Sequence, residues 1–180
     1  MAIRLNPNIK IDKLLADKIT ANDLNCVDCF KLATAQLLCE QFPQAKVHLV
    51  PQQQTKPISQ IPPAVFVQVF ELHKEERLGS DLEWEIAANI AYMSKDKNAE
   101  TEQIDAAMKI MDKMRTVPPL EGMEYPYTMY VSDSETVDGI VNVTGTVKVW
   151  ERRPDDAPLI EIADTNVNIK ELEEENGGCS

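Results

Sequence analysis

Cys26 and Cys29 stand three residues apart at the start of a helical pattern. A zinc or redox role for such a pair requires partners, such as a second cysteine pair, histidines, or a strand that leads directly into the helix. The sequence has only two histidines, His48 and His73, and no second C-x-x-C. On a helix both thiols lie on one side, and cysteine outside disulfides is commonly buried. We therefore favour structural packing over a metal-dependent or redox site.

Acidic residues form two further groups that merit attention. Glu83 and Glu85 are two apart on a predicted strand, so they share a face. Paired carboxylates perform acid–base chemistry only in a cleft that shifts their pKa values, and nothing places a cleft there. Asp133, Glu135 and Asp138 crowd one turn, but the following glycine comes one position too late for an EF-hand calcium loop. We interpret the first group as a solvated face or one that meets a neighbour's cations, and the second as a solvated hairpin end.

The remaining motifs of catalysis are missing from the sequence. It contains no G-x-G-x-x-G, no Walker loop, no H-E-x-x-H and no nucleophile elbow. With two histidines and no motif, we expect a protein that is not an enzyme, with no catalytic residue, no metal and no cofactor.

Charge and length limit the possible partners. Of 180 residues, 43% are hydrophobic, and 30 acidic residues against 18 basic ones give a net charge of −12. Such a chain is poorly suited to gripping nucleic acid, where phosphate neutralisation supplies most affinity, or an anionic membrane surface. The sequence has no apolar run of about 18 residues and no signal-peptide core. We expect no membrane contact and synthesis in the cytoplasm.

Residues 64–93 give the clearest structural pattern. Two runs rich in β-branched and aromatic residues show a period of two, and a polar break containing Gly79 separates them. This pattern predicts two paired strands. We place this hairpin at the centre of a sheet.

Two helices are expected around the hairpin, over residues 25–41 and 99–115, from apolar residues at helical spacing. A short strand over 45–50 follows the first helix. Residues 51–63 are rich in proline and glutamine and predict a loop or an edge connection.

A second hairpin is expected over residues 127–150. Asp138-Gly139 between apolar residues indicates a type I′ turn. A two-residue turn there would set Tyr127 opposite Trp150 across the hairpin. Gly145 interrupts a valine-rich face and predicts a bulge.

These elements predict an α+β fold, in which a mainly antiparallel sheet carries two helices on one face. The predicted order is α-β-β-β-α-β-β, with extended arms at both ends. We divide the chain into an N-terminal arm (1–25), a single α+β domain (26–155), an extended C-terminal arm (156–170) and a disordered acidic and Gly-rich tail (171–180).

Several strings, with the order of the elements, resemble the tail terminator proteins of tailed bacteriophages, of the type found in Gram-positive phages and prophages. The strings are AVFVQVFELHKEERLGSDLEWEIAANIAYM, SKDKNAETEQIDAAMKIMDKM and ETVDGIVNVTGTVKVW, followed by PLIE at 158–161 and VNIK at 167–170. The resemblance covers about residues 27–170. The chain departs from the family in its first 25 residues and in the long segment 51–63.

The resemblance implies a subunit of a homo-hexameric ring in the neck of the virion. Such a ring sits on the last ring of tail tube protein, ends its polymerisation and docks the tail to the head–tail connector. Six chains at −12 each would carry about −72, and an acidic lumen would let DNA pass without specific binding. Alternatives are another neck or tail-completion protein, a small ligand-binding or regulatory α+β domain, and a metal-dependent enzyme that uses Cys26 and Cys29.

Two sets of residues are the candidate functional sites under this interpretation. We expect Glu83, Glu85 and Asn89 to face the channel, because a strand pattern places them on one polar face. The N-terminal arm and the C-terminal arm have no evident place in a single core, so we expect them to contact neighbouring subunits. The candidate contact residues in the C-terminal arm are Leu159, Ile160, Ile162, Val167 and Ile169.

Overall fold

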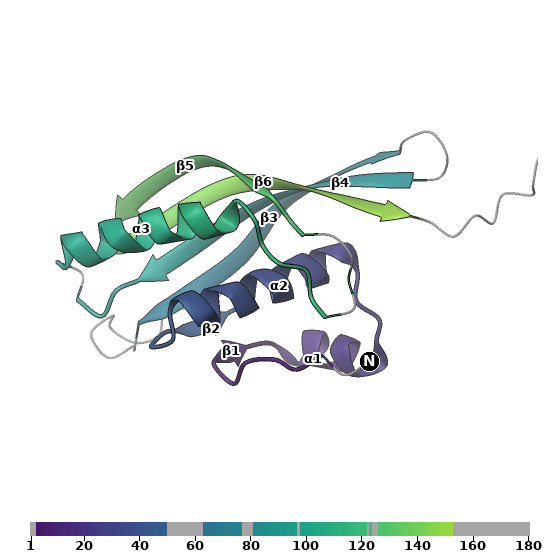
Figure 1. Cartoon of the computed structure of the whole chain (residues 1–180), viewed down its shortest axis with the longest axis horizontal. Helices are drawn as coiled ribbons and strands as arrows, with labels where there is room; N and C mark the ends of the chain where they lie inside the picture. The colour runs from purple at the N-terminus through teal and green to yellow at the C-terminus, as the bar shows by residue number, and fades with distance from the viewer. Residues whose placement is uncertain are drawn as a thin grey trace, which may run out of the picture.

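The computed structural model describes residues 3–49, 63–76, 81–96, 98–121, 123 and 126–152 (Figure 1). The α+β class and the mostly antiparallel sheet predicted from the sequence are confirmed. The elements are β1 (Ile9–Lys10), α1 (Lys13–Ala21), α2 (Cys26–Gln41), β2 (Lys46–His48), β3 (Ala64–Glu76), β4 (Asp81–Met93), α3 (Glu100–Met114), β5 (Met129–Val137) and β6 (Ile140–Arg152).

The strands form one sheet in the order β1-β2-β3-β4-β6-β5. The long strands β3, β4, β6 and β5 are antiparallel, whereas β1 and β2 run parallel to the start of β3. Strand β4 is central, since β3 pairs with one of its edges and β6 with the other. The hairpin predicted over residues 64–93 is therefore the middle of the sheet.

The N-terminal segment contributes more regular structure than the sequence pattern predicts. It forms β1, which pairs with β2, and the helix α1. The described residues thus form three helices where two were predicted, and β1 and α1 precede the first predicted helix. Ile9 and Leu15 are buried in the main core cluster. Short elements of this kind leave a weak periodic signal, because their burial depends on the rest of the fold.

The core lies between the sheet and its helices. Alternate residues of the central strands point to one side, and the apolar ones there form a single cluster with residues of α2 and α3. Figure 1 shows α2 and α3 running along the same side of the strands. The largest fully buried side chains in this layer include Phe30, Leu38, Ile86, Ile90 and Ile110.

The β5–β6 hairpin confirms one prediction and corrects another. Val137 pairs with Ile140, and Asp138 (φ 51°) and Gly139 (φ 79°) adopt the left-handed conformations of a type I′ turn. The predicted pairing of Tyr127 with Trp150 is wrong. A register shift between residues 131 and 133 moves the pairing by one, and Tyr127 lies outside β5.

Tyr127 instead forms an isolated bridge with Val117, through backbone N···O distances of 2.8 and 2.9 Å. Its ring is buried and packs edge-on against Phe30, with 5.6 Å between the ring centroids. The chain before β5 therefore turns away from β6. This divergence leaves the end of β6 without β5 as its neighbour.

Within the described residues, no helix is both long and apolar enough to cross a membrane.

Gly145 allows the close approach of β5 to β6. A Cβ at this position would lie 2.5 Å from the carbonyl oxygen of Tyr130 and 2.8 Å from Cε of Met129. The irregularity that Gly145 predicted lies on the partner strand, in the register shift beside it. The glycine is thus required by the backbone of β5.

We predict that Gly145→Ala lowers the free energy of unfolding by about 1–3 kcal/mol, because the added methyl group forces the two strands apart. Urea denaturation followed by circular dichroism measures the change. The control Thr146→Ala, on the opposite face of β6, should change it by less than about 1 kcal/mol. Equal losses in the two variants would contradict this account.

Candidate functional site

We call the side of the sheet that faces away from the helices the open face. On β4 it carries the odd-numbered side chains, since Ile86, Ala88 and Ile90 lie in the core on the other side. The three predicted channel-facing residues, Glu83, Glu85 and Asn89, therefore share the open face. The paired strand β6 contributes Asn142, Thr144, Thr146, Lys148 and Trp150 to the same face.

A lysine from β6 connects the two glutamates. Lys148 lies directly across from Glu85 in the strand register. Its Nζ is 3.0 Å from Oε1 of Glu83 and 3.7 Å from Oε2 of Glu85. The Glu83 side chain is only 5% exposed, whereas those of Glu85 and Lys148 are 46% and 50% exposed. The pair is therefore a partly buried ion pair with a second, solvated carboxylate beside it.

Lys148 is a site residue that sequence reasoning missed. Its position opposite the glutamates depends on the pairing of β4 with β6, strands that lie more than one element apart in the chain. The alternating pattern of β6 predicts only which face of the strand Lys148 occupies. No local pattern predicts how β6 is aligned with β4. The predicted alternative, cations supplied by a neighbour, is not needed for Glu83, because the chain supplies its own.

We call the row of polar side chains formed by Glu83, Glu85 and Lys148 the polar strip. A pair of amide side chains extends it along the sheet. Asn89 Nδ2 donates a hydrogen bond to Asn142 Oδ1 at 3.1 Å. The Asn89 Oδ1 atom is buried and has no hydrogen-bond partner among the described residues. It is an acceptor that a donor from another molecule would satisfy.

The open face is acidic over its long strands. Among the described side chains of β3–β6 on this face, carboxylates outnumber cations. The carboxylates are Glu75, Glu83, Glu85, Asp133 and Glu135, and the cation is Lys148. Lys10 and Lys46 share this face only at its β1–β2 edge, beside the buried His48. That imidazole has a lowered pKa, because burial and the two lysines disfavour its charged form.

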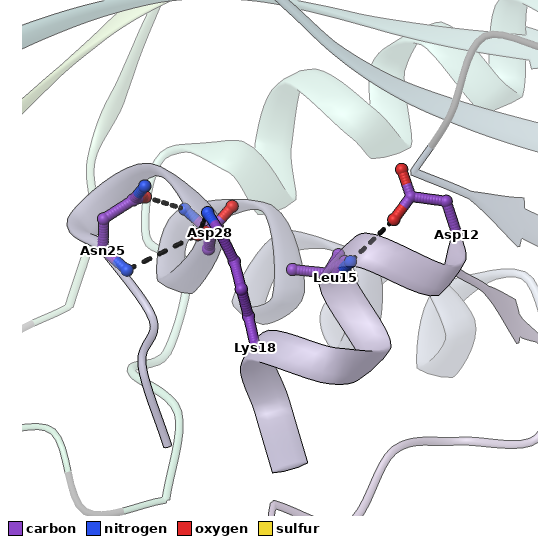
Figure 2. A network of polar contacts seen from close by, with 5 residues as sticks. All are labelled: Asp12, Leu15, Lys18, Asn25 and Asp28. Atoms are coloured by element: carbon purple, nitrogen blue, oxygen red, sulfur yellow. Dashed lines mark hydrogen bonds and ion pairs between the residues drawn. The ribbon is translucent and has the colours of Figure 1, made fainter. Parts of the chain in front are cut away.

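The cysteine pair lies in the first turn of α2. Polar contacts of the neighbouring residues Asn25 and Asp28 join this turn to Lys18 of α1 (Figure 2). Asn25 caps the helix by accepting the N–H of Asp28 at 2.8 Å, and the Asp28 carboxylate accepts the N–H of Asn25 at 3.5 Å. Lys18 of α1 forms an ion pair with the same carboxylate at 2.7 Å. This capping box and ion pair fix where α2 begins.

The Cys29 side chain is almost fully buried and belongs to the main core cluster. Burial, and to a smaller extent the nearby Asp28 carboxylate, raise the pKa of this thiol to about 11. Burial likewise raises the pKa of Cys39 to about 11. In the described part of the chain, no group of three or more Cys, His, Asp or Glu side chains is arranged to hold a metal ion. Cys29 and Cys39 are therefore core residues whose environment disfavours the thiolate that metal binding or nucleophilic attack requires.

Comparison of the sequence with known protein families gives a match over most of the chain. Residues 30–158 match the profile of the family described as phage tail terminator protein, from the first turns of α2 to beyond the end of β6. The chain belongs to the phage tail terminator protein family. Comparison with individually curated proteins gives no significant match.

This membership gives the chain a structural role in completing a phage tail, as a component of the virion. The family is one of structural proteins that are generally not enzymes. The matched region contains Glu83, Glu85 and Asn89 but neither β1 nor α1. The predicted contact residues from Leu159 to Ile169 lie outside both the matched region and the described residues.

We predict that Lys148→Met lowers the free energy of unfolding by about 1–2 kcal/mol, because it leaves the Glu83 carboxylate buried without this cation. The cost stays below that of a fully buried pair, since half of Lys148 is in solvent. Chemical denaturation measures it.

The control Lys113→Met removes an ion pair with the exposed Asp112 and should cost about 0.5 kcal/mol or less. Adding Glu83→Gln to Lys148→Met should recover most of the loss, since a neutral amide no longer needs the cation. A Lys148→Met variant as stable as Lys113→Met would show that the ion pair contributes little.

We predict that Cys29 and Cys39 react slowly with iodoacetamide in the native protein at pH 8. A raised pKa leaves less thiolate, so at pH 8 only about one thiol in a thousand is ionised, and the rate should rise about tenfold per pH unit up to about 11. Peptide mass spectrometry measures labelling at each site. In urea both sites should react on the order of 100 times faster, as their pKa values return to about 8.5. Native rates equal to those in urea would refute the assignment.

Proposed function

We propose that this chain is the tail terminator itself: a subunit of a homo-hexameric ring that caps the tail tube, ends its polymerisation and docks the tail to the head–tail connector. The observation that carries this proposal is the family match over residues 30–158. The match includes every strand of the sheet except β1, most of α2 and all of α3. The resemblance of the sequence to the Gram-positive phage and prophage type is part of the same proposal.

The ring would close by joining the two edges of the sheet. Strand β2 pairs with only the first three residues of β3, so the outer edge of β3 from residue 67 onward meets no other strand in the described chain. Strand β5 is the outermost strand at the other edge. A strand edge is completed by pairing with another chain, and joining two different edges gives a head-to-tail contact that can close into a ring.

Exposed apolar side chains lie at both edges. On β3, Phe70 is 60% exposed and Leu72 is 50% exposed. On β5, Tyr130 is 67% exposed and Val137 is 50% exposed. Large apolar residues gathered on the free edges of a sheet favour association over solvation. The N-terminal arm and the C-terminal arm would add further contacts between neighbours.

The open face would line the channel of this ring. Its carboxylates on β3–β6 give the wall a negative potential, which disfavours binding of the DNA phosphates and lets the genome pass. Glu83, Glu85 and Asn89 would occupy the middle of each subunit's share of the wall. Lys148 neutralises part of this charge, because it lies beside both Glu83 and Glu85. The exposed carboxylates farther from it on the same face, such as Asp133 and Glu135, would contribute most of the repulsion.

Light scattering coupled to size-exclusion chromatography, with negative-stain microscopy, tests the ring. We expect rings of about six subunits, alone or on the ends of tail tubes assembled from the tube protein. A compact monomer or dimer that leaves tube length unchanged would overturn the proposal and favour a small ligand-binding or regulatory domain.

The wall assignment has its own test in the double variant Glu85→Lys, Glu135→Lys. If the open face lines the lumen, this ring should retain short double-stranded DNA at low salt, and retention should fall steeply as salt rises. The matched control Asp105→Lys, Asp112→Lys makes the same charge change on exposed positions of α3. A gel-shift assay that finds equal retention by both variants would show that the open face does not line the channel.

A further inference from the structure

A cleft of about 500 Å³ lies beside the end of β6. One wall comes from the start of α2 and the residues before it, and the other from the segment that precedes β5. The lining is mainly apolar, with Lys148 and Asn25 among its polar members. The residues that the following argument uses are Leu24, Cys26, Met123, Tyr127, Val149 and Trp150.

This cleft runs along a strand edge. The pairing of β5 with β6 begins at Met129 and Val147, so from Val149 to the end of β6 no strand of the described chain lies on that side. Strand β4 occupies the opposite side along the whole of β6. The divergence of Tyr127 toward Val117 creates both features at once, the free edge and the cleft beside it.

A strand edge beside an apolar cleft fits an added peptide strand. Backbone groups on the edge would pair with the peptide, and alternate side chains of the peptide would enter the cleft. The peptide should therefore be extended, with apolar residues two apart. Trp150 lies beside this edge and is 63% exposed. An apolar surface of that size in solvent favours contact with another chain.

The chain contains one such segment beyond β6. Residues 159–169 read LIEIADTNVNI, with Ile160 and Ile162 two apart and Glu161 between them. Six residues separate this segment from Arg152, the last residue of β6. Fully extended, such a linker spans about 20 Å, which is comparable to the width of four strands spaced about 4.8 Å apart. In the proposed ring, a linker of that length would allow the segment to reach the adjacent subunit.

We propose that residues 159–162 of one copy add a strand to the free edge of β6 in a neighbouring copy, with Ile160 and Ile162 in the cleft and Glu161 pointing away. This inference rests on the proposed ring and names the surface that receives the C-terminal arm. Each subunit would donate one arm and receive one, so the exchange would connect every neighbouring pair of the ring. The occupant of the cleft is thus a second copy of this chain.

Cys26 provides a test, because it lines the cleft and is partly exposed. The full-length variant Ile162→Cys, with Cys179→Ser to remove the other cysteine of the C-terminal segment, is oxidised and separated on non-reducing gels. We expect a ladder of cross-linked chains that ends at the ring size, and its loss when Cys26→Ser is added. Glu161→Cys, in the same background, should form at least about tenfold less cross-link, because its side chain points away.

An unlabelled peptide of residues 157–171 in excess should suppress the ladder by competing for the cleft, and the same peptide with Ile162→Asp should not. Cross-links formed only within a chain would overturn the inference, since the arm would then fold back on its own β6. Absence of any cross-link through Ile162→Cys would also overturn it. Light scattering on the same samples separates this failure from that of the proposed function: a ring without the ladder keeps the ring and rejects the exchanged arm.

Discussion

The structure depends on the double pairing of β4. This thirteen-residue strand is bonded to β3 on one edge and to β6 on the other along nearly all of its length. Its even-numbered residues pack in the core against α2 and α3, whereas Glu83, Glu85 and Asn89 form the polar strip of the open face and Ala91 and Met93 form a small apolar cluster at one end of that face. Because a shift of one residue would exchange the two faces, apolar burial on one side fixes which side chains the other side presents.

In the polar strip of the open face, the burial of one carboxylate determines which side chain lies beside it. A carboxylate that is 5% exposed requires a partner, and Lys148 supplies it from the neighbouring strand. The pair holds β4 and β6 in register at the end of the sheet where β5 is absent, and it leaves Glu85 in solvent. In the proposed ring, the open face would therefore form an acidic channel wall without a large uncompensated charge inside each subunit.

Irregularities in the sheet are as informative as its regular pairing. The register shift in β5 lies beside the close approach at Gly145. Before β5 the chain turns toward Val117, and Tyr127 is buried against Phe30. The same turn uncovers the end of β6 and opens the cleft beside the cysteine pair. In the proposed ring each subunit would pair with two neighbours, and unpaired strand edges provide the backbone groups for such contacts.

The sequence by itself determined the elements with strong local periodicity. The alternation over residues 64–93, the helical spacing of α2 and α3 and the Asp138-Gly139 turn each follow from side-chain patterning within a few neighbouring residues. It also placed Glu83, Glu85 and Asn89 on one face, since a strand has a period of two. Only the tertiary structure decided that Lys148 meets Glu83, that Tyr127 leaves the hairpin and that Ile9 and Leu15 enter the core. These contacts join residues far apart in the chain, and their geometry depends on strand order and register, which no local pattern encodes.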